Sequence, residues 1–249
     1  MPTLFLTPRQ TVDSQALWKA AAAAGWSTER LSGWRVPEHL RAAPQPVLYG
    51  EALFGPALAE QLGLQLLNPA EDWLVRLPRS HSQREISMCS LGEARQRTAP
   101  AFIKPPNDKS FEAAVYQGAN LPQGLDEAMP VLVSEVVHWA CEFRGFVLDR
   151  TLQTLSLYAR DGAPQEHLDY ACTPDELAAA TAFVNSVLAD ARVDLPRATV
   201  IDVGQIAGRR WACVEQNAAW GAGLYGCQPA AVLRVVEHAS VPLQTQPSA

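Results

Sequence analysis

The 249-residue sequence has few residues of the kinds that build disulfide-held or metal-held scaffolds. Its five cysteines are scattered, odd in number and without a Cys-x-x-Cys pair, and its five histidines are equally dispersed. This spacing excludes a disulfide framework and argues against a zinc site. We therefore expect reduced, mostly buried thiols in a cytoplasmic protein.

The sequence also lacks an excess of basic residues and any long apolar run. Its 20 lysines and arginines are outnumbered by 26 aspartates and glutamates, so no overall field attracts nucleic acid or an anionic membrane. The apolar runs are too short to span a bilayer, and the first ten residues have no basic flank and only a short apolar core, unlike a signal peptide. We expect a globular protein without a membrane or nucleic-acid partner; its oligomeric state stays open.

In its first third the sequence contains an alternation of short apolar runs and helical segments. The first predicted helix is capped near Asp13 and ended by Gly25, and the third begins near Pro69. Such a βαβα order is typical of a small parallel sheet with helices. The predicted strands are residues 3–7, 46–50 and 64–68, and the predicted helices are residues 13–25, 54–63 and 69–78.

After residue 78 the pattern changes to antiparallel strands with few helices. Ser90 and Glu93 suit a capping box, and Thr173 caps the clearest helix of the chain, residues 173–191. Further strands are predicted at residues 101–104, 130–137, 141–149 and 151–159, and a last helix at residues 229–238. We divide the chain into an α/β part (1–77), a first lobe (78–134), a second lobe (135–240) and a loose tail (241–249).

A hairpin at residues 200–217 carries the strongest chemical signal. If Gly208 and Arg209 form a two-residue type II′ turn, Asp202 lies opposite Glu215, and Asn217 points to the same face. Two facing carboxylates among apolar neighbours repel each other, so a cation between them is expected. Mg²⁺ suits these oxygen ligands and is usually shared with phosphate. The alternative is a longer turn that slips the register and leaves one carboxylate in solvent.

Three charged residues outside the hairpin are weaker candidates. Lys104 ends a predicted strand before Pro105-Pro106, a position suited to a phosphate-binding cation, although an ordinary surface lysine fits equally. Glu135 and Glu142 lie seven residues apart, where a carboxylate can accept from a ribose hydroxyl or simply be solvated.

Taken together, these residues resemble the ATP-grasp superfamily, in particular a small clade described only as a domain of unknown function. The family pattern is a strand-borne lysine, an acidic inter-lobe linker, a ribose-binding glutamate and an Asp followed by Glu-x-Asn. The resemblance covers about residues 75–226 and is carried by "FIKPPNDKSF", "EFRGFV" and "EQNAAWGAGLYG". It implies an α/β and α+β architecture, in which two lobes with antiparallel sheets clasp a nucleotide behind a small α/β pre-domain.

The resemblance also implies roles for the candidate residues. Lys104 is expected to meet the α- or β-phosphate of ATP, Glu135 and nearby backbone the adenine edge, and Glu142 the ribose. The metal site for one or two Mg²⁺ ions is expected at Asp202, Glu215 and Asn217.

Some features depart from the family pattern. The loop after Lys104 is "PPNDKSF" in place of a glycine-rich flap, and Lys109 is expected to supply charge there. The chain has Val200 where many members have an arginine, so Arg144 is a candidate phosphate fork; pairing with Glu142 or Asp149 is the equal alternative. For a further upstream cation we expect Arg84, with Arg76 and Arg79 as rivals.

The function implied by the resemblance is an ATP- and Mg²⁺-dependent carboxylate–amine (or thiol) ligase that acts through an acyl phosphate. The acceptor is expected to be a small molecule or a peptide, held by the first α/β part and by loops near Arg160 and Tyr225. Two alternatives stay open at this point: a non-catalytic module that binds nucleotide or a partner, and a phosphotransferase acting on a hydroxyl.

Overall fold

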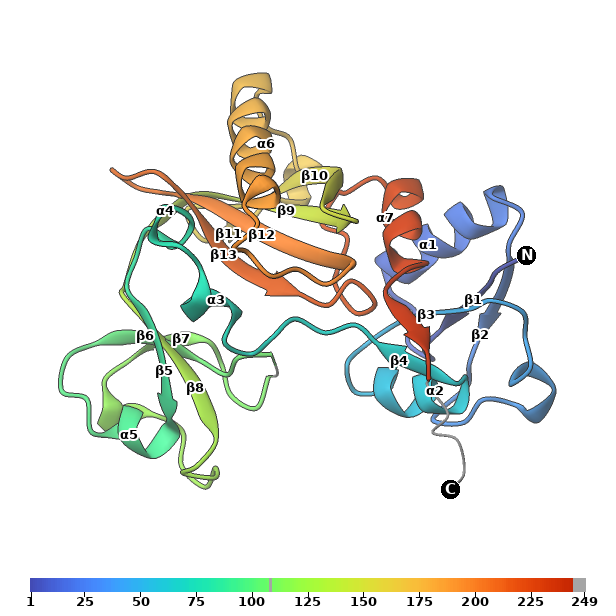
Figure 1. Cartoon of the computed structure of the whole chain (residues 1–249), viewed down its shortest axis with the longest axis horizontal. Helices are drawn as coiled ribbons and strands as arrows, with labels where there is room; N and C mark the ends of the chain where they lie inside the picture. Colours follow the sequence, from blue (N-terminus) through green and yellow to red (C-terminus); the bar gives the residue numbers. More distant parts are fainter. Residues whose placement is uncertain (108, 244–249) are drawn as a thin grey trace.

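The computed structural model describes residues 1–107 and 109–243. Figure 1 shows three bodies: an N-terminal α/β domain, a small sheet joined to it by an extended connection, and a larger sheet that lies against both. None of the described helices is long and apolar enough to cross a membrane.

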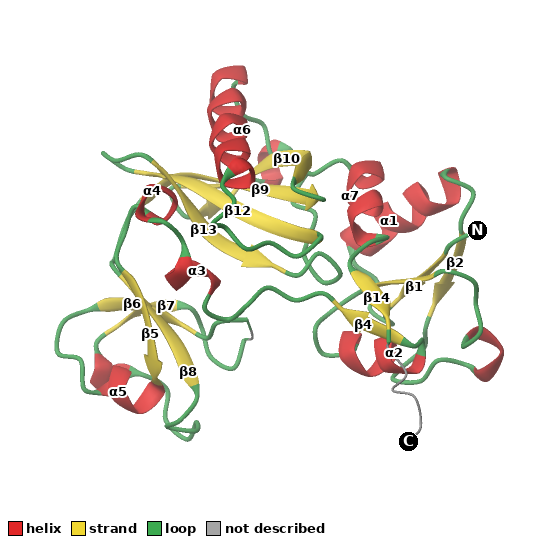
Figure 2. Cartoon of the chain, in the orientation of Figure 1, coloured by secondary structure: helices red, strands yellow, loops and turns green. Residues whose placement is uncertain are grey.

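The N-terminal domain is built on the predicted parallel sheet. Its order is β2-β1-β3, with β1 (Thr3–Leu6), β2 (Ser27–Arg30) and β3 (Pro46–Tyr49). Leu4 and Leu6 face α1 (Val12–Ala23) and the late helix α7 (Pro229–Val236), whereas Phe5 faces α2 (Gly55–Gln61). Figure 2 shows α1 and α7 together on one side of this sheet.

Three local predictions for this domain were wrong. The cap of α1 is Thr11, which forms a capping box with Ser14, so that Asp13 lies in the first turn. The third strand, β4 (Leu64–Leu66), leaves the parallel sheet and pairs antiparallel with β14 (Ser240–Pro242). Val241 and Pro242 are therefore in a strand and not in a loose tail; the remaining tail residues 244–249 lie outside the described residues. Strand β2 was not predicted, because its sequence "STER" has no apolar alternation.

The first lobe is a four-stranded antiparallel sheet of order β5-β8-β6-β7. One side is filled by Leu91, Ala94 and Leu121 from the segments that cross it. The predicted capping box is confirmed, since Ser90 and Glu93 cap each other at the start of α5. The elements are β5 (Ile86–Ser90), α5 (Leu91–Arg95), β6 (Ala101–Lys104), β7 (Ala114–Tyr116), a 3-10 turn (Gly118–Asn120) and β8 (Pro130–Ser134).

The second lobe is a five-stranded antiparallel sheet of order β11-β10-β9-β12-β13. Helix α6 covers one face and begins, as predicted, at the capping residue Thr173. Two short helices precede the first lobe, and α3 starts at Trp73, four residues after Pro69, where its Trp73 and Leu74 join the second-lobe core. The elements are α3 (Trp73–Arg76), α4 (Arg79–Ser82), β9 (Trp139–Leu148), β10 (Thr151–Arg160), β11 (Ala163–Pro164), α6 (Pro174–Ala189), β12 (Ala198–Ile206) and β13 (Trp211–Asn217), with 3-10 turns at Glu38–Leu40 and Glu166–Leu168.

The β12–β13 hairpin has a longer turn than expected. Arg209 N donates to Ile206 O (2.9 Å), and Ile206 N donates to Arg210 O (3.3 Å), so the loop has three residues and is not a two-residue turn. Gly208 sits in it with a φ of 69°, a left-handed conformation that glycine adopts without steric cost. By itself, this extra loop residue would shift the strand pairing by one and turn Glu215 to the other face.

A β-bulge compensates for the longer turn. Val203 pairs with Cys213, yet Asp202 pairs with Glu215, so Val214 is an extra residue on β13. The two irregularities cancel, and Asp202 and Glu215 face each other as the sequence predicted.

Candidate active site

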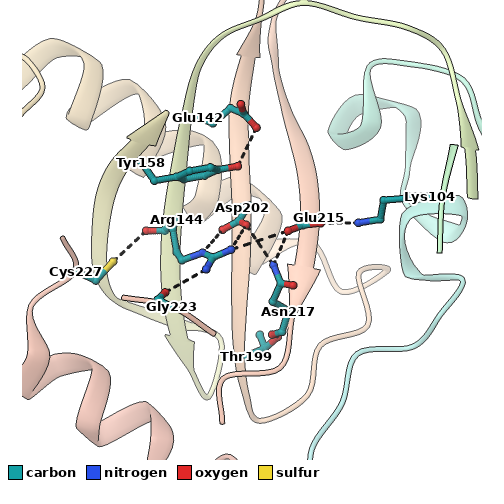
Figure 3. Close-up of polar contacts among 10 residues, drawn as sticks. All are labelled: Lys104, Glu142, Arg144, Tyr158, Thr199, Asp202, Glu215, Asn217, Gly223 and Cys227. Carbon is teal, nitrogen blue, oxygen red and sulfur yellow. Dashed lines mark hydrogen bonds and ion pairs between the residues drawn. The ribbon is translucent and has the colours of Figure 1, made fainter. Parts of the chain in front are cut away.

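Four strands bring the candidate residues together. Glu142 and Arg144 lie on β9, Asp202 on the neighbouring β12, and Glu215 with Asn217 on β13, while Lys104 reaches across from β6 of the first lobe. Figure 3 shows that the four side chains Arg144, Asp202, Glu215 and Asn217 converge on one face of the second-lobe sheet, with the Lys104 amine pointing toward Glu215. Alternation along each strand explains this, since residues two apart share a face.

Arg144 forms a two-point contact with Asp202, its direct neighbour on the adjacent strand. Its Nε is 2.9 Å from Oδ1 and its Nη2 is 2.6 Å from Oδ2, and Nη1 donates to Gly223 O. Asp202 is fully buried. Burial raises the pKa of Asp202, and the Arg144 guanidinium opposes that rise. Of the partners considered for Arg144, Glu142 instead accepts from Tyr158, and Asp149 binds Arg197.

Glu215 receives the other positive charge. Lys104 Nζ lies 2.5 Å from Glu215 Oε2, and Asn217 Nδ2 lies 2.9 Å from Oε1. Burial by itself would raise the pKa of Glu215, but Lys104 and Asn217 outweigh it and lower this pKa to about 2. Each of the two carboxylates thus has its own cation, an arginine for Asp202 and a lysine for Glu215.

The donor set fits a hard divalent cation. Asn217 Nδ2 is within hydrogen-bond distance of both carboxylates, 3.2 Å from Asp202 Oδ2, so oxygens of Asp202 and Glu215 converge on one point. Rotation of this amide would present Oδ1 to the same point. Among the described residues no group of three or more His, Cys, Asp or Glu side chains could hold a metal. A cation here would therefore depend on Asn217 and on oxygens from a ligand such as phosphate.

A cavity of about 440 Å³ lies between the two lobes, next to this cluster. Its walls are apolar where Phe102, Val115 and Val136 meet and polar toward Lys104 and Glu215. This volume and mixture are typical of a small-molecule site. Of the candidates Arg84, Arg76 and Arg79, only Arg84 lines it in the described structure, and Lys109 is exposed and not part of the lining.

The two glutamates proposed for the nucleoside also line the cavity. Glu142 accepts from Tyr158 Oη at 2.8 Å, and burial raises the pKa of this carboxyl although that hydrogen bond opposes the rise. Glu135 accepts from Arg209 Nη2 at 2.6 Å, which lowers its pKa. Its carboxylate is therefore paired with the tip of the hairpin.

The sequence analysis did not identify Tyr158, Trp139 or Arg209. Tyr158 is displaced from regular pairing by a bulge between Leu157 and Ala159, so its place beside Glu142 could not be read from strand alternation. Trp139 lines the cavity and stacks on Arg84 at 5.0 Å. A tryptophan directly after the linker was the one available signal.

Comparisons with known proteins agree on one fold. The family model that matches residues 81–235 describes an ATP-grasp domain, the second family of its clade. No curated protein matches the chain. D-cycloserine synthetase DcsG is similar, with 14% identity, coverage of 95% of this chain and 99% of that chain, and a TM-score of 0.62.

Two further solved structures extend this likeness. D-alanine–D-alanine ligase from Bacillus anthracis has 9% identity, coverage of 96% and 97%, and a TM-score of 0.56. The ATP-grasp ligase PsnB, complexed with a minimal precursor, has 16% identity, coverage of 87% and 90%, and a TM-score of 0.51. At such identities the likeness concerns the fold.

Proposed function

The chain belongs to the ATP-grasp family that this model describes, and from this premise we propose that it is an ATP- and Mg²⁺-dependent ligase that joins a carboxylate to an amine or thiol. The observation that carries the proposal is the convergence of two carboxylates and an amide from one hairpin on Lys104, beside the inter-lobe cavity. The ligases of similar fold support the reaction class.

In this proposal the cavity holds the nucleotide. Lys104 meets the α- or β-phosphate as a point charge, and Glu142 accepts from the ribose. The Glu135 carboxylate is bound by Arg209, so we assign the adenine edge to the linker backbone at residues 135–137. Lys109 is left as a predicted phosphate contact from the exposed loop.

Asp202, Glu215 and Asn217 are proposed to hold Mg²⁺, which would neutralise charge on the phosphates when bound. Charge then rearranges within the chain's own residues. Lys104 leaves Glu215 and becomes available to phosphate oxygens. Arg144 keeps Asp202 ionised and, 4.0 Å from Glu215 Oε1, lies close enough to assist at the transferred phosphoryl group.

The proposed reaction has two steps. A carboxylate oxygen of the acid attacks the γ-phosphorus of ATP, which releases ADP and forms an acyl phosphate. An amine or thiol then attacks the acyl carbon, and inorganic phosphate leaves with the bonding electron pair. Arg144 is the residue placed to stabilise the charge that develops on the phosphoryl group.

The acceptor is proposed to enter beside Tyr225. This ring is 41% exposed and lies 4.5 Å from the Arg144 guanidinium. The adjacent Leu224 N donates to Asp13 of the N-terminal domain, so the acceptor would be shared by that domain and the second lobe. A peptide is a reasonable acceptor class, because the structurally similar PsnB was solved as a complex with a minimal precursor.

The proposal is tested by ADP release across a panel of acids, amines and peptides with Mg·ATP. Glu215→Ala should abolish turnover and sharply weaken Mg·ATP binding, whereas Glu60→Ala, an exposed carboxylate on α2, should change neither. Unchanged turnover in Glu215→Ala rules the assignment out. Mass analysis of the product separates the reactions: a new amide or thioester indicates a ligase, a phosphorylated hydroxyl a phosphotransferase, and binding without any product a non-catalytic module.

A further inference from the structure

The bulge at Val214 decides where Glu215 points. From the turn outward, Gln205 pairs with Trp211, Gly204 with Ala212 and Val203 with Cys213. Continued regularly, this register would set Asp202 opposite Val214 and turn Glu215 to the opposite face of the sheet. The proposed metal site therefore exists only while β13 stays bulged at this residue.

The bulge exposes two backbone carbonyls on the same side of an edge strand. In a regular strand successive carbonyls point to opposite sides, but Cys213 O and Val214 O both accept from one guanidinium. Arg84 Nη1 is 2.6 Å from Cys213 O, and Arg84 Nη2 is 3.1 Å from Val214 O. Since β13 ends its sheet, no further strand of the described structure lies on its outer side to accept this role.

Arg84 is itself fixed by contacts outside the hairpin. Its Nε donates to Ser134 Oγ (3.2 Å) on β8, and Nη1 also donates to Ser82 O (3.2 Å). Its guanidinium lies over the Trp139 ring, and the side chain is buried. Four of its five N–H groups are thus used within the protein. Such a held guanidinium is suited to impose a backbone shape.

We propose that Arg84 is a positioning residue: by binding Cys213 O and Val214 O it holds the bulge that keeps Glu215 opposite Asp202. The role of Glu215 in holding Mg²⁺ rests on the proposed function, but the bulge and its register do not. This differs from the sequence-based expectation that Arg84 acts through a phosphate contact, and the two roles separate experimentally.

The test combines Arg84→Met with deletion of Val214. Deletion removes the extra residue, so a regular ladder again sets Glu215 opposite Asp202 and needs no arginine. Backbone NOEs between residues 202 and 215 report the register, and Mn²⁺, used as a probe with ADP, reports the metal site. Arg197→Met, a distant exposed arginine that pairs with Asp149, is the control.

We expect Arg84→Met to lose the 202–215 NOEs and to weaken Mn²⁺ binding by about tenfold or more, as for lost supports of metal ligands. The double variant should recover both, and the deletion alone should keep both. If Arg84→Met fails to fold, recovery of a folded protein by the deletion supports the proposal, and failure of both variants overturns it.

Two other outcomes overturn the proposal. Intact 202–215 NOEs in Arg84→Met would show that the bulge does not need Arg84. Loss of metal-free ADP binding that the deletion does not recover would assign Arg84 to phosphate. Absence of nucleotide and Mn²⁺ binding in the wild-type protein would contradict the proposed function, while the NOE readout would still decide the role of Arg84.

Discussion

Lys104 and Glu215 form an ion pair across the two lobes, with Nζ 2.5 Å from Oε2. Each partner is also the proposed ligand of a different part of Mg·ATP: Lys104 of a phosphate, Glu215 of the metal. Nucleotide binding therefore replaces this pair by two new contacts. The pair keeps both side chains ionised and close to their proposed working positions before the nucleotide arrives.

This ion pair predicts a pH-dependent stability. The pKa of Glu215 is about 2 in the folded protein and about 4.3 in an unfolded chain. Glu215 therefore stabilises the fold fully above about pH 4.3, and the contribution is lost as the pH falls toward about 2. In Lys104→Met the folded pKa rises, so the free energy of unfolding should fall less steeply in this window. Urea unfolding at a series of pH values measures it, with exposed Lys19→Met as control; parallel curves would contradict the prediction.

Arg144→Met should be strongly destabilising. The change leaves the fully buried Asp202 carboxylate without its cation, which typically costs about 3–5 kcal/mol. Arg144→Met combined with Asp202→Asn removes both charges and should regain much of this loss. Denaturant unfolding of the four proteins in a double-mutant cycle gives the coupling. If the two losses simply add, the pair does not act as described.

Tyr158→Phe should make nucleotide binding more sensitive to acid. Its hydroxyl stabilises the ionised Glu142, so its loss raises the already elevated pKa of that carboxyl. A protonated Glu142 accepts less well from a ribose hydroxyl, and affinity should fall more between pH 8 and pH 6 in the variant than in the wild type. A loss of about 1 kcal/mol is expected from one hydrogen bond. Calorimetric titration with Mg·ATP at both pH values measures it; equal pH dependence would exclude this role for Tyr158.

Thr173→Ala should lower stability without touching the site. Thr173 Oγ1 accepts from Glu176 N at 3.2 Å, and its loss at the start of α6 typically costs about 1 kcal/mol. Ser186→Ala, in the exposed last part of the same helix, should cost little. Thermal unfolding and Mg·ATP binding are both measured, and a change in affinity in Thr173→Ala would show that α6 is coupled to the nucleotide site.

Local signals in the sequence were sufficient for most elements. The two capping boxes, at Ser90 and Thr173, place helix starts because they depend on residues three apart. Strand alternation and the order of charged residues likewise indicated the two antiparallel sheets and the ATP-grasp family. The assignment of Lys104, Glu142 and the hairpin residues to one site was a resemblance, and the structure brings these side chains together around the cavity.

Other features depended on residues far apart in the chain. The pairing of β4 with β14 joins segments separated by most of the sequence, and no local pattern indicates it. The partner of Arg144 was missed for a related reason: Asp202 lies next to it only because β9 and β12 are neighbours in the sheet.

The sequence by itself determined that Asp202 and Glu215 lie on two strands of one hairpin, since short-range periodicity and a glycine turn are enough for that. Only the tertiary structure decided that they face each other. A three-residue turn moves the register by one, and the bulge that restores it is held by Arg84 from another part of the chain. Backbone carbonyls that need a distant donor leave no mark in the local sequence, because their hydrogen-bond partners are chosen by the packing of the two lobes.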